Sequence, residues 1–274
     1  MSATPPPPAR TEADGIAAPI GACYSGSGSG KALGLSVALC CLNERPNLPT
    51  VVSRMKALEQ ALGDRLHEIV VVDGGSTDGS WEMLEREAAA WGKLKLLRQQ
   101  PPRGYGSGYQ QSVLACSGGL IVTCDTDLNY DMTEVVRMLP LLSDADLVVA
   151  NPFLRGAQAW LGPSRMVLTH SVALLYRLVL AGRPGVGTVF TPILRAGRAD
   201  LFRKAAPRGN GFTASAEFMM RVHLIPGSRV VEIPVSVHCR GAGASKMNKI
   251  RNTFAHLRLM GRVAAYRMGW RKEI

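Results

Sequence analysis

The stretch HEIVVVDGGSTDGSWEMLEREAAAWG, residues 67–92, decides the fold class of this protein. Residues 67–73 form a short apolar run that ends at Asp73, which is typical of a buried β-strand. The glycines and Ser76 that follow predict a sharp turn, where the backbone can approach a ligand closely. The remaining residues predict a helix that ends at Gly92. The stretch is therefore a strand–turn–helix unit.

The same kind of unit recurs along the chain. Further strands are predicted over 33–42, 93–99, 119–125 and 146–150, further helices over 45–63, 110–118, 132–143 and 166–182, and a glycine-rich turn over 101–109. Strands that alternate with helices are typical of a doubly wound sheet. The sequence therefore predicts an α/β fold with a Rossmann-like, mostly parallel central sheet flanked by helices.

Polar and acidic residues follow several of these strands. Asn43 and Glu44 come after the first strand, Asp73 ends the second, and Asp125 and Asp127 come at the end of the fourth. In such sheets the ligand lies outside the carboxyl ends of the strands. Each residue alone is explained by a turn or a helix cap, but their agreement predicts a ligand site at this edge.

The two acids in VTCDTDLNYD, residues 122–131, leave two interpretations open. Aspartates end strands because their side chains bond to nearby backbone groups. Alternatively, Asp125 and Asp127 hold a divalent cation whose other ligands are phosphate oxygens. The chain has no GxGxxG fingerprint after its first strand, which disfavours a hydride-transfer enzyme.

The amino-acid composition indicates which classes of binding partner suit this protein. The chain has 274 residues, 46% of them hydrophobic, and 32 basic against 21 acidic residues give a net charge of +11. This charge favours anionic partners, but nucleic acid is disfavoured because the acids cluster where a binding groove should be basic. The cysteines and histidines lack zinc-site spacing.

No signal peptide or run of ~18 apolar residues is visible, so we expect reduced cysteines and a cytoplasmic protein.

Four motifs together resemble family 2 glycosyltransferases of the GT-A fold. They are LNERPNLP at 42–49, VVVDGGSTDGS at 70–80, DTD at 125–127 and RGAGASK at 240–246. Their order is most similar to that of dolichol- or polyprenol-phosphate mannose synthases, and the similarity covers residues 34–250. The resemblance implies a UDP- or GDP-linked sugar donor, Mg²⁺ or Mn²⁺, and inversion at the anomeric carbon.

The resemblance also implies roles for individual residues of the donor site. Leu39, Leu42 and Glu44 stand where the family lines the nucleoside pocket, and Asp73 where it contacts the base. The metal and diphosphate would be held by Asp125 and Asp127, with Asn129 as a further metal contact and Asp127 counted as catalytic. Phosphate-binding roles fall on Arg240, Ser245 and Lys246, and donor-side basic positions on Arg165, Arg195 and Arg198.

The acceptor half departs from the family pattern. Val189 replaces an acid that relatives often carry, and a displaced arginine appears only at Arg155. Two acceptors therefore stay open: polyprenyl phosphate at an anionic membrane surface, or a soluble acceptor in secondary metabolism, such as one tethered to an acidic carrier protein. The position of Glu217 matches a family acid near the acceptor. Glu217 is predicted either to act as a base towards a hydroxyl or amine or to orient a phosphate acceptor. The alternative is that it only interacts favourably with the dipole at the start of its helix.

The sequence predicts three segments. Residues 1–32 are rich in Pro, Gly and Ser and should be a disordered tail. Residues 33–240 should form the GT-A domain, and residues 241–274 the phosphate-binding strap and a basic amphipathic helix. That helix and residues 166–182 either dock on the inner face of a membrane or pack on their own domain.

Overall fold

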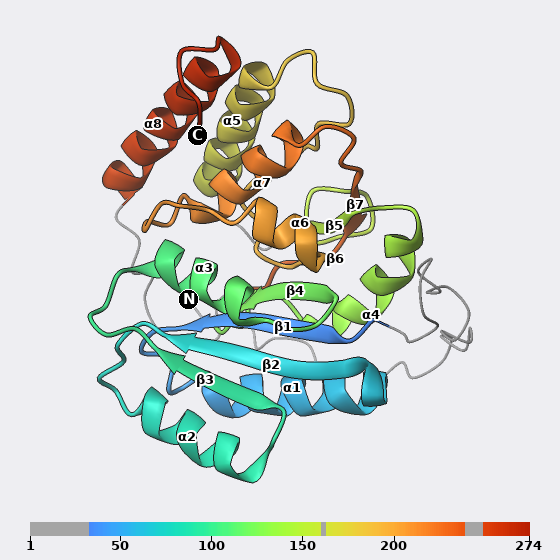
Figure 1. Ribbon diagram of the computed structural model, residues 1–274, viewed down its shortest axis with the longest axis vertical. Coiled ribbons are helices and arrows are strands. Elements are labelled where there is room, and N and C mark those ends of the chain that lie inside the picture. Colours follow the sequence, from blue (N-terminus) through green and yellow to red (C-terminus); the bar gives the residue numbers. More distant parts are fainter. Residues whose placement is uncertain (1–32, 160–162, 239–248) are drawn as a thin grey trace, which may run out of the picture.

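Seven strands form one mixed sheet at the centre of the protein (Figure 1). The computed structural model describes residues 33–159, 163–238 and 249–274. The strands lie in the order β3-β2-β1-β4-β6-β5-β7, and within these residues only β6 runs antiparallel to its neighbours. Their bounds are β1 (Leu35–Cys41), β2 (Leu66–Asp73), β3 (Leu94–Arg98), β4 (Leu120–Asp125), β5 (Leu147–Asn151), β6 (Arg195–Arg198) and β7 (Val230–Pro234). The predicted mostly parallel sheet is confirmed.

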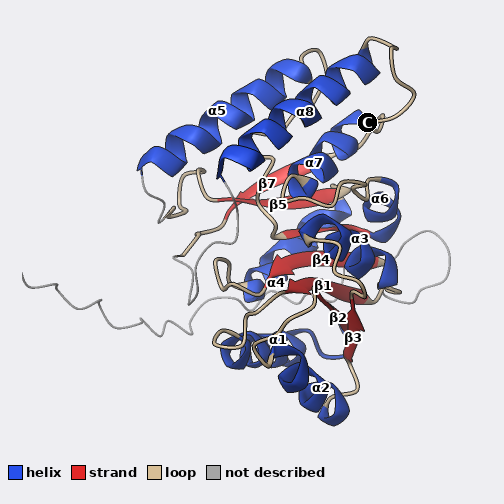
Figure 2. Ribbon diagram, turned by 90° about the vertical axis from the view of Figure 1, so that its left-hand side faces the viewer, coloured by secondary structure: helices blue, strands red, loops and turns tan. Residues whose placement is uncertain are grey.

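Helices cover both faces of the sheet. The core on one face is closed by α1 (Leu48–Leu62), α2 (Ser80–Ala90) and α4 (Val135–Met138). The core on the other face contains α3 (Tyr105–Ala115), α6 (Ala199–Lys204) and α7 (Ala214–Leu224). Beyond α7, the long helices α5 (Pro163–Val179) and α8 (Lys249–Arg267) lie side by side as an outer layer (Figure 2).

Apolar spacing explains these elements. Strand β1 is buried on both of its faces, because Val37 and Leu39 enter one core while Ala38 enters the other. Helix α1 buries Leu48, Val51, Val52, Met55, Leu58 and Leu62, which is the spacing of one helical face.

The glycine-rich turn predicted over 101–109 is wrong in its second half, where α3 already begins at Tyr105. Gly104 precedes the helix with a φ of 91°, a conformation that glycine adopts without strain. A Cβ on Gly106 would lie 2.0 Å from the Gly209 carbonyl oxygen. The glycines therefore allow α3 to pack closely against the loop that precedes α7.

The single helix predicted over 132–143 is also wrong. The chain there forms the 3₁₀ turn η2 (Met132–Glu134), the short helix α4 and a second 3₁₀ turn, η3 (Leu139–Ser143). Pro140 lies inside the segment and cannot donate a backbone hydrogen bond, so a continuous α-helix is interrupted. A third 3₁₀ turn, η1 (Gly63–Arg65), links α1 to β2.

Candidate active site

A cavity of about 400 Å³ opens at the carboxyl ends of β1, β2 and β4. The strand register explains its place, since Cys40 pairs with Asp125 on β4 and Cys41 pairs with Asp73 on β2. The strand ends therefore meet at one edge of the sheet. Its walls include residues from the β1 and β4 ends, from α3, and from α5 and α8.

The loops after β1 and β2 are joined by hydrogen bonds. The Asn43 backbone N–H donates to Ser76 Oγ at 2.8 Å, and Asn43 Oδ1 accepts from the Thr77 N–H at 2.8 Å. The Glu44 N–H donates to Ser80 Oγ at 3.0 Å. These contacts fix the Glu44 end of the cavity, which Leu42 and Gly74 also line.

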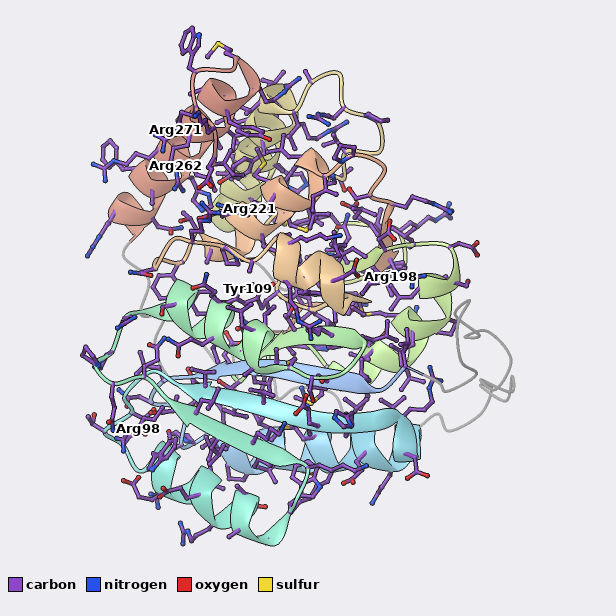
Figure 3. The ribbon with its side chains drawn as sticks, in the orientation of Figure 1. Arg98, Tyr109, Arg198, Arg221, Arg262 and Arg271 are labelled. Carbon is purple, nitrogen blue, oxygen red and sulfur yellow. The ribbon has the colours of Figure 1, made fainter. Side chains whose placement is uncertain are left out.

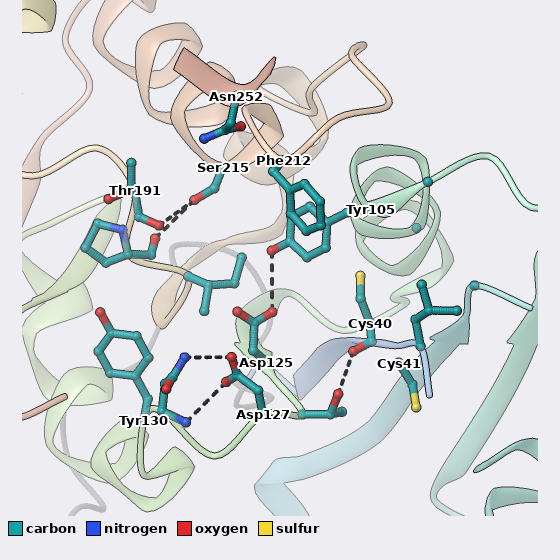
Figure 4. Close-up of a pocket in the computed structure, with 18 of the residues that line it drawn as sticks. Cys40, Cys41, Tyr105, Asp125, Asp127, Tyr130, Thr191, Phe212, Ser215 and Asn252 are labelled. Atoms are coloured by element: carbon teal, nitrogen blue, oxygen red, sulfur yellow. Dashed lines mark hydrogen bonds between the residues drawn. The ribbon is translucent and has the colours of Figure 1, made fainter. Parts of the chain in front are cut away.

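Asp125 and Asp127 both line the cavity, and Asn129 lies beside them. Asp127 accepts hydrogen bonds from the Asn129 backbone N–H at 3.2 Å and from Asn129 Nδ2 at 2.6 Å (Figure 4). Tyr105 Oη donates to Asp125 Oδ1 at 3.4 Å. The two carboxylates predicted from DTD are thus brought together with the predicted amide.

This donor set fits a hard divalent cation. The described residues hold no cluster of three or more His, Cys, Asp or Glu side chains for a metal. Two carboxylates and one amide oxygen suit Mg²⁺ or Mn²⁺ when substrate phosphate oxygens complete the shell. Glu44, Asp125 and Asp127 line the cavity, whereas no lysine or arginine does so among the described residues. The described lining alone therefore offers an anionic diphosphate no positively charged side chain of lysine or arginine.

Aromatic side chains form the wall between Asp125 and α7. Tyr105 stacks on Phe212 with ring centroids 5.5 Å apart and an interplanar angle of 18°. Ser215 Oγ donates to the Thr191 carbonyl at 2.9 Å, which joins α7 to the segment before β6. The DTD carboxylates lie across the cavity from Asn252 of α8 in Figure 4.

Helices α5 and α8 close the far end of the cavity. Thr169 and Val172 of α5 and Asn252 and His256 of α8 line it. Tyr176 Oη and His256 Nδ1 lie 2.6 Å apart in a buried hydrogen bond between the two helices. Burial lowers the pKa of His256 below its ordinary value and so favours the neutral imidazole.

The nucleoside-pocket prediction is partly wrong. Leu42 and Glu44 line the cavity, but Leu39 is fully buried in the core beneath the sheet. Side chains alternate along β1, so Cys40 faces the cavity instead. The carboxylate of Asp73 does not line the cavity among the described residues; it accepts from the Gly75 N–H at 2.9 Å and orders the loop at its edge.

The structure does not bring the basic residues predicted for the donor site together at the cavity. Arg195 is fully buried outside the cavity lining, and its Nη2 donates to Ser215 Oγ at 2.8 Å. Arg198, labelled in Figure 3, pairs with Leu120 at the start of β4, whereas Asp125 ends that strand at the opposite edge of the sheet. A donor-binding role does not fit that position. Arg165 falls within α5, and its side chain is outside the described part of the structure.

Glu217 is fully buried in α7 and does not belong to the described lining of the cavity. Its carboxylate lies 3.1 Å from Arg221 Nη2 and 3.4 Å from Arg262 Nη2. It also accepts from the backbone N–H groups of Arg208 at 2.9 Å and Gly209 at 3.2 Å. The geometry gives this carboxylate a structural role in joining α7, α8 and the loop that carries Phe212.

Two other carboxylates outside the described cavity lining also make structural contacts. Asp200 pairs with Lys204 at 3.6 Å, and Glu232 accepts from the Val189 N–H at 3.0 Å. The strap residues Arg240, Ser245 and Lys246 and the predicted tail over 1–32 lie outside the described residues. Sequence reasoning missed Cys40, Tyr105 and His256; only the tyrosine, inside a glycine-rich loop near a strand end, gave a usable signal.

Comparisons with known proteins identify the family of the chain. Residues 36–204 match the model of the family "Glycosyl transferase family 2". A "Dolichol-phosphate mannosyltransferase" of Pyrococcus furiosus is 25% identical over 244 residues, which cover 88% of this chain and 65% of that protein. This chain therefore spans just under two thirds of that relative. An "Undecaprenyl-phosphate mannosyltransferase" of Micrococcus luteus is 26% identical over 215 residues, which cover 75% of this chain and 84% of that protein.

Solved structures share the fold. Glucosyl-3-phosphoglycerate synthase from Mycobacterium tuberculosis, in complex with Mn²⁺, UDP-glucose and phosphoglyceric acid, superposes with a TM-score of 0.62 at 20% identity. The match covers 86% of this chain and 80% of that chain. The same enzyme in complex with Mg²⁺ and UDP gives a TM-score of 0.60 at 18% identity.

Proposed function

The chain belongs to glycosyl transferase family 2 and has the GT-A fold, and we propose that it transfers a sugar from a UDP- or GDP-linked donor to polyprenyl phosphate. The reaction would depend on Mg²⁺ or Mn²⁺ and invert the anomeric carbon. The observation that carries the proposal is the cavity wall formed by Asp125, Asp127 and Asn129.

The charge of the cavity supports the metal dependence. Its described lining contains three carboxylates, Glu44, Asp125 and Asp127, and no lysine or arginine. A diphosphate bound there without a cation would be repelled. Asp125, Asp127 and Asn129 would hold a divalent cation, which would supply the charge that stabilises the leaving diphosphate.

Residues in the walls of the cavity would make the remaining contacts with the donor. Leu42, Cys40 and Glu44 would hold the nucleoside beside the loop that Asp73 orders. Tyr105, stacked on Phe212, would pack against the sugar and keep Asp125 in place. Arg240, Ser245 and Lys246 remain the proposed phosphate strap on the resemblance of RGAGASK alone, since they lie outside the described residues.

The acceptor would enter from the side of α5 and α8. Its oxygen would then form a bond to the anomeric carbon while the bond from that carbon to the diphosphate oxygen breaks on the opposite face. Attack from the opposite face inverts the configuration. A phosphate oxygen is already ionised near pH 7, so this reaction needs no general base, and Glu217 is left to its ion pairs with Arg221 and Arg262.

The outer surfaces of these two helices favour a membrane acceptor. Helix α8 packs inward through His256, Leu259 and Val263, while Phe254 is 59% and Leu257 50% exposed. Helix α5 exposes Val167, Leu174 and Leu178. Apolar side chains beside basic ones suit the interface of an anionic membrane.

We therefore propose a peripheral position at the inner face of the membrane. No helix within the described residues is long and apolar enough to cross a bilayer. The names of the archaeal and bacterial relatives support the choice of a polyprenyl phosphate.

A transfer assay tests the proposal. Radiolabelled UDP- and GDP-sugars would be offered with polyprenyl phosphate in detergent, with Mn²⁺, with Mg²⁺ and with EDTA. We expect a labelled lipid product of inverted configuration that disappears in EDTA. Transfer to a soluble or carrier-tethered acceptor, with none to the lipid, would support the alternative acceptor. A donor that binds without transfer or hydrolysis would indicate a non-catalytic binder.

A further inference from the structure

The acceptor end of the cavity contains one basic side chain among the residues described. His256 lines it from α8, with the neutral side chains of Asn252, Thr253 and Thr169 around it. The lining carboxylates, Glu44, Asp125 and Asp127, belong to the loops and strand ends of the sheet. An anionic acceptor that enters between α5 and α8 therefore meets the imidazole of His256 in the described part of the wall.

The state of the imidazole follows from its partner. Tyr176 is fully buried, and within the described chain its hydroxyl forms a hydrogen bond only with His256 Nδ1, at 2.6 Å. A buried hydroxyl needs an acceptor for its proton. The neutral imidazole offers one ring nitrogen as an acceptor and the other as a donor. When Tyr176 Oη donates to Nδ1, the proton of His256 is on Nε2.

We propose that His256, with its tautomer fixed by Tyr176, binds the phosphate of the acceptor through Nε2–H. This inference rests on the proposed function and deepens it. An Nε2 that already carries a proton cannot take one from a hydroxyl or an amine. The pair therefore suits an acceptor that is ionised before it binds, and it disfavours an alcohol or an amine.

The binding pair also joins the cavity to the helices that face outward. Tyr176 belongs to α5 and His256 to α8, and the same helices expose Leu174, Leu178, Phe254 and Leu257. A phosphate held at His256 leaves its lipid chain at the junction of these helices. The head group and the chain of one acceptor are thereby bound by two sides of the same helix pair.

Direct binding of the acceptor tests this assignment without the donor. The probe is a short-chain polyprenyl phosphate in detergent, titrated by calorimetry, and the same polyprenol without phosphate is its control. We expect His256→Ala to weaken binding of the phosphate by roughly tenfold to a hundredfold, the effect of losing a hydrogen bond to a charged group. Binding of the uncharged polyprenol should be unchanged.

Substituted variants separate this role from a structural one. His256→Gln keeps an N–H near the position of Nε2 and should restore most of the affinity, while Tyr176→Phe should weaken binding several-fold. The control His67→Ala, at an exposed histidine on β2, should bind like the wild type. Thermal unfolding of each variant shows whether it is folded.

Steady-state kinetics then separates binding from proton transfer. His256→Ala should raise KM for the polyprenyl phosphate and leave KM for the sugar nucleotide unchanged. Unchanged affinity for the phosphate probe in His256→Ala, a glutamine variant no better than alanine, or a hundredfold loss in kcat at constant KM would overturn the inference. If the wild type binds the phosphate probe but no nucleotide sugar, the proposed function fails while the phosphate site stands.

Discussion

The two halves of the molecule differ in how their sites are built. In residues 33–130 the candidate residues follow parallel strands, and the sheet brings Glu44, Asp125 and Asp127 to one cavity. In residues 151–274 the candidate residues come from helices and an antiparallel strand. There Glu217 is buried among arginines, and Arg198 lies at the opposite edge of the sheet.

The difference has a geometric cause. The carboxyl ends of parallel strands meet at one edge whatever the side chains are, so a residue's place follows from where its strand ends. The direction of a helix residue depends on what the helix packs against. Helix α8 turns His256 towards the cavity and Phe254 towards solvent because Leu259 and Val263 pack inward.

The largest expected effect is at the metal site of the first half. Asp127→Asn should lower kcat/KM for transfer by roughly a thousandfold, because a neutral amide is a poor ligand for a hard cation. The cation would stabilise the charge of the transition state by several kcal/mol. Steady-state rates across Mn²⁺ concentrations measure it. Asp131→Asn, at the cap of η2, is the control and should stay active. Full activity of the Asp127 variant in EDTA would show that transfer does not require a metal at this site.

The next effect separates structure from chemistry in the second half. Glu217→Gln should lower the free energy of unfolding by about 3 kcal/mol, because it leaves the partly buried Arg221 without its carboxylate. Chemical denaturation measures this loss, and the folded enzyme should keep most of its activity. Asp200→Asn removes the exposed pair with Lys204 at the same helical spacing and should cost less than ~1 kcal/mol. A stable but inactive Glu217 variant would show that the carboxylate takes part in the reaction.

A smaller effect is expected at the proposed strap. Lys246→Ala should reduce donor affinity or turnover by about 2 kcal/mol, the contribution of a charge-assisted phosphate contact. Donor KM and kcat measure the loss, and the melting temperature should not change. Lys56→Ala, on the outer surface of α1, is the control. Equal catalytic efficiency in both variants would make RGAGASK a surface loop.

The smallest effect concerns the membrane surface. Arg258→Gln on α8 should weaken binding to anionic liposomes by about 1 kcal/mol, since each basic residue near such a surface contributes about that much. Sedimentation at low and high salt measures it, and binding should fall as salt screens the charges. Arg86→Gln, on α2, should bind like the wild type. Absence of liposome binding by the wild type would favour a soluble acceptor.

Much of the fold was predictable because it depends on local patterns. The apolar runs placed β1, β2, β4 and β5 within two residues of their bounds. Glycine frequency misplaced the start of α3, since close packing against Gly209 uses glycine inside a helix. Leu39 was assigned to the wrong face, although the alternation of side chains along β1 already places Cys40 on the other side.

The acceptor end was not predictable for a physical reason. His256 depends on Tyr176, 80 residues earlier in the chain, and the two meet only because α5 packs on α8. Phe254 and Leu257 have the spacing of an apolar helix face, but both are exposed in the structure. Amphipathic spacing identifies a helix and leaves open which of its faces is covered.

The central claim is that Asp125, Asp127 and Asn129 bind a nucleotide sugar through a divalent cation. The most direct test is the melting temperature of the protein with UDP- and GDP-sugars, each with Mn²⁺ and with EDTA. A ligand that binds the folded state stabilises it by about 2.7 kcal/mol at a hundred times its Kd. We predict that one nucleotide sugar raises the melting temperature with Mn²⁺ and not with EDTA, and that Asp127→Asn abolishes the rise. A rise that is equal with Mn²⁺ and with EDTA, or no rise with any nucleotide sugar, would contradict the account.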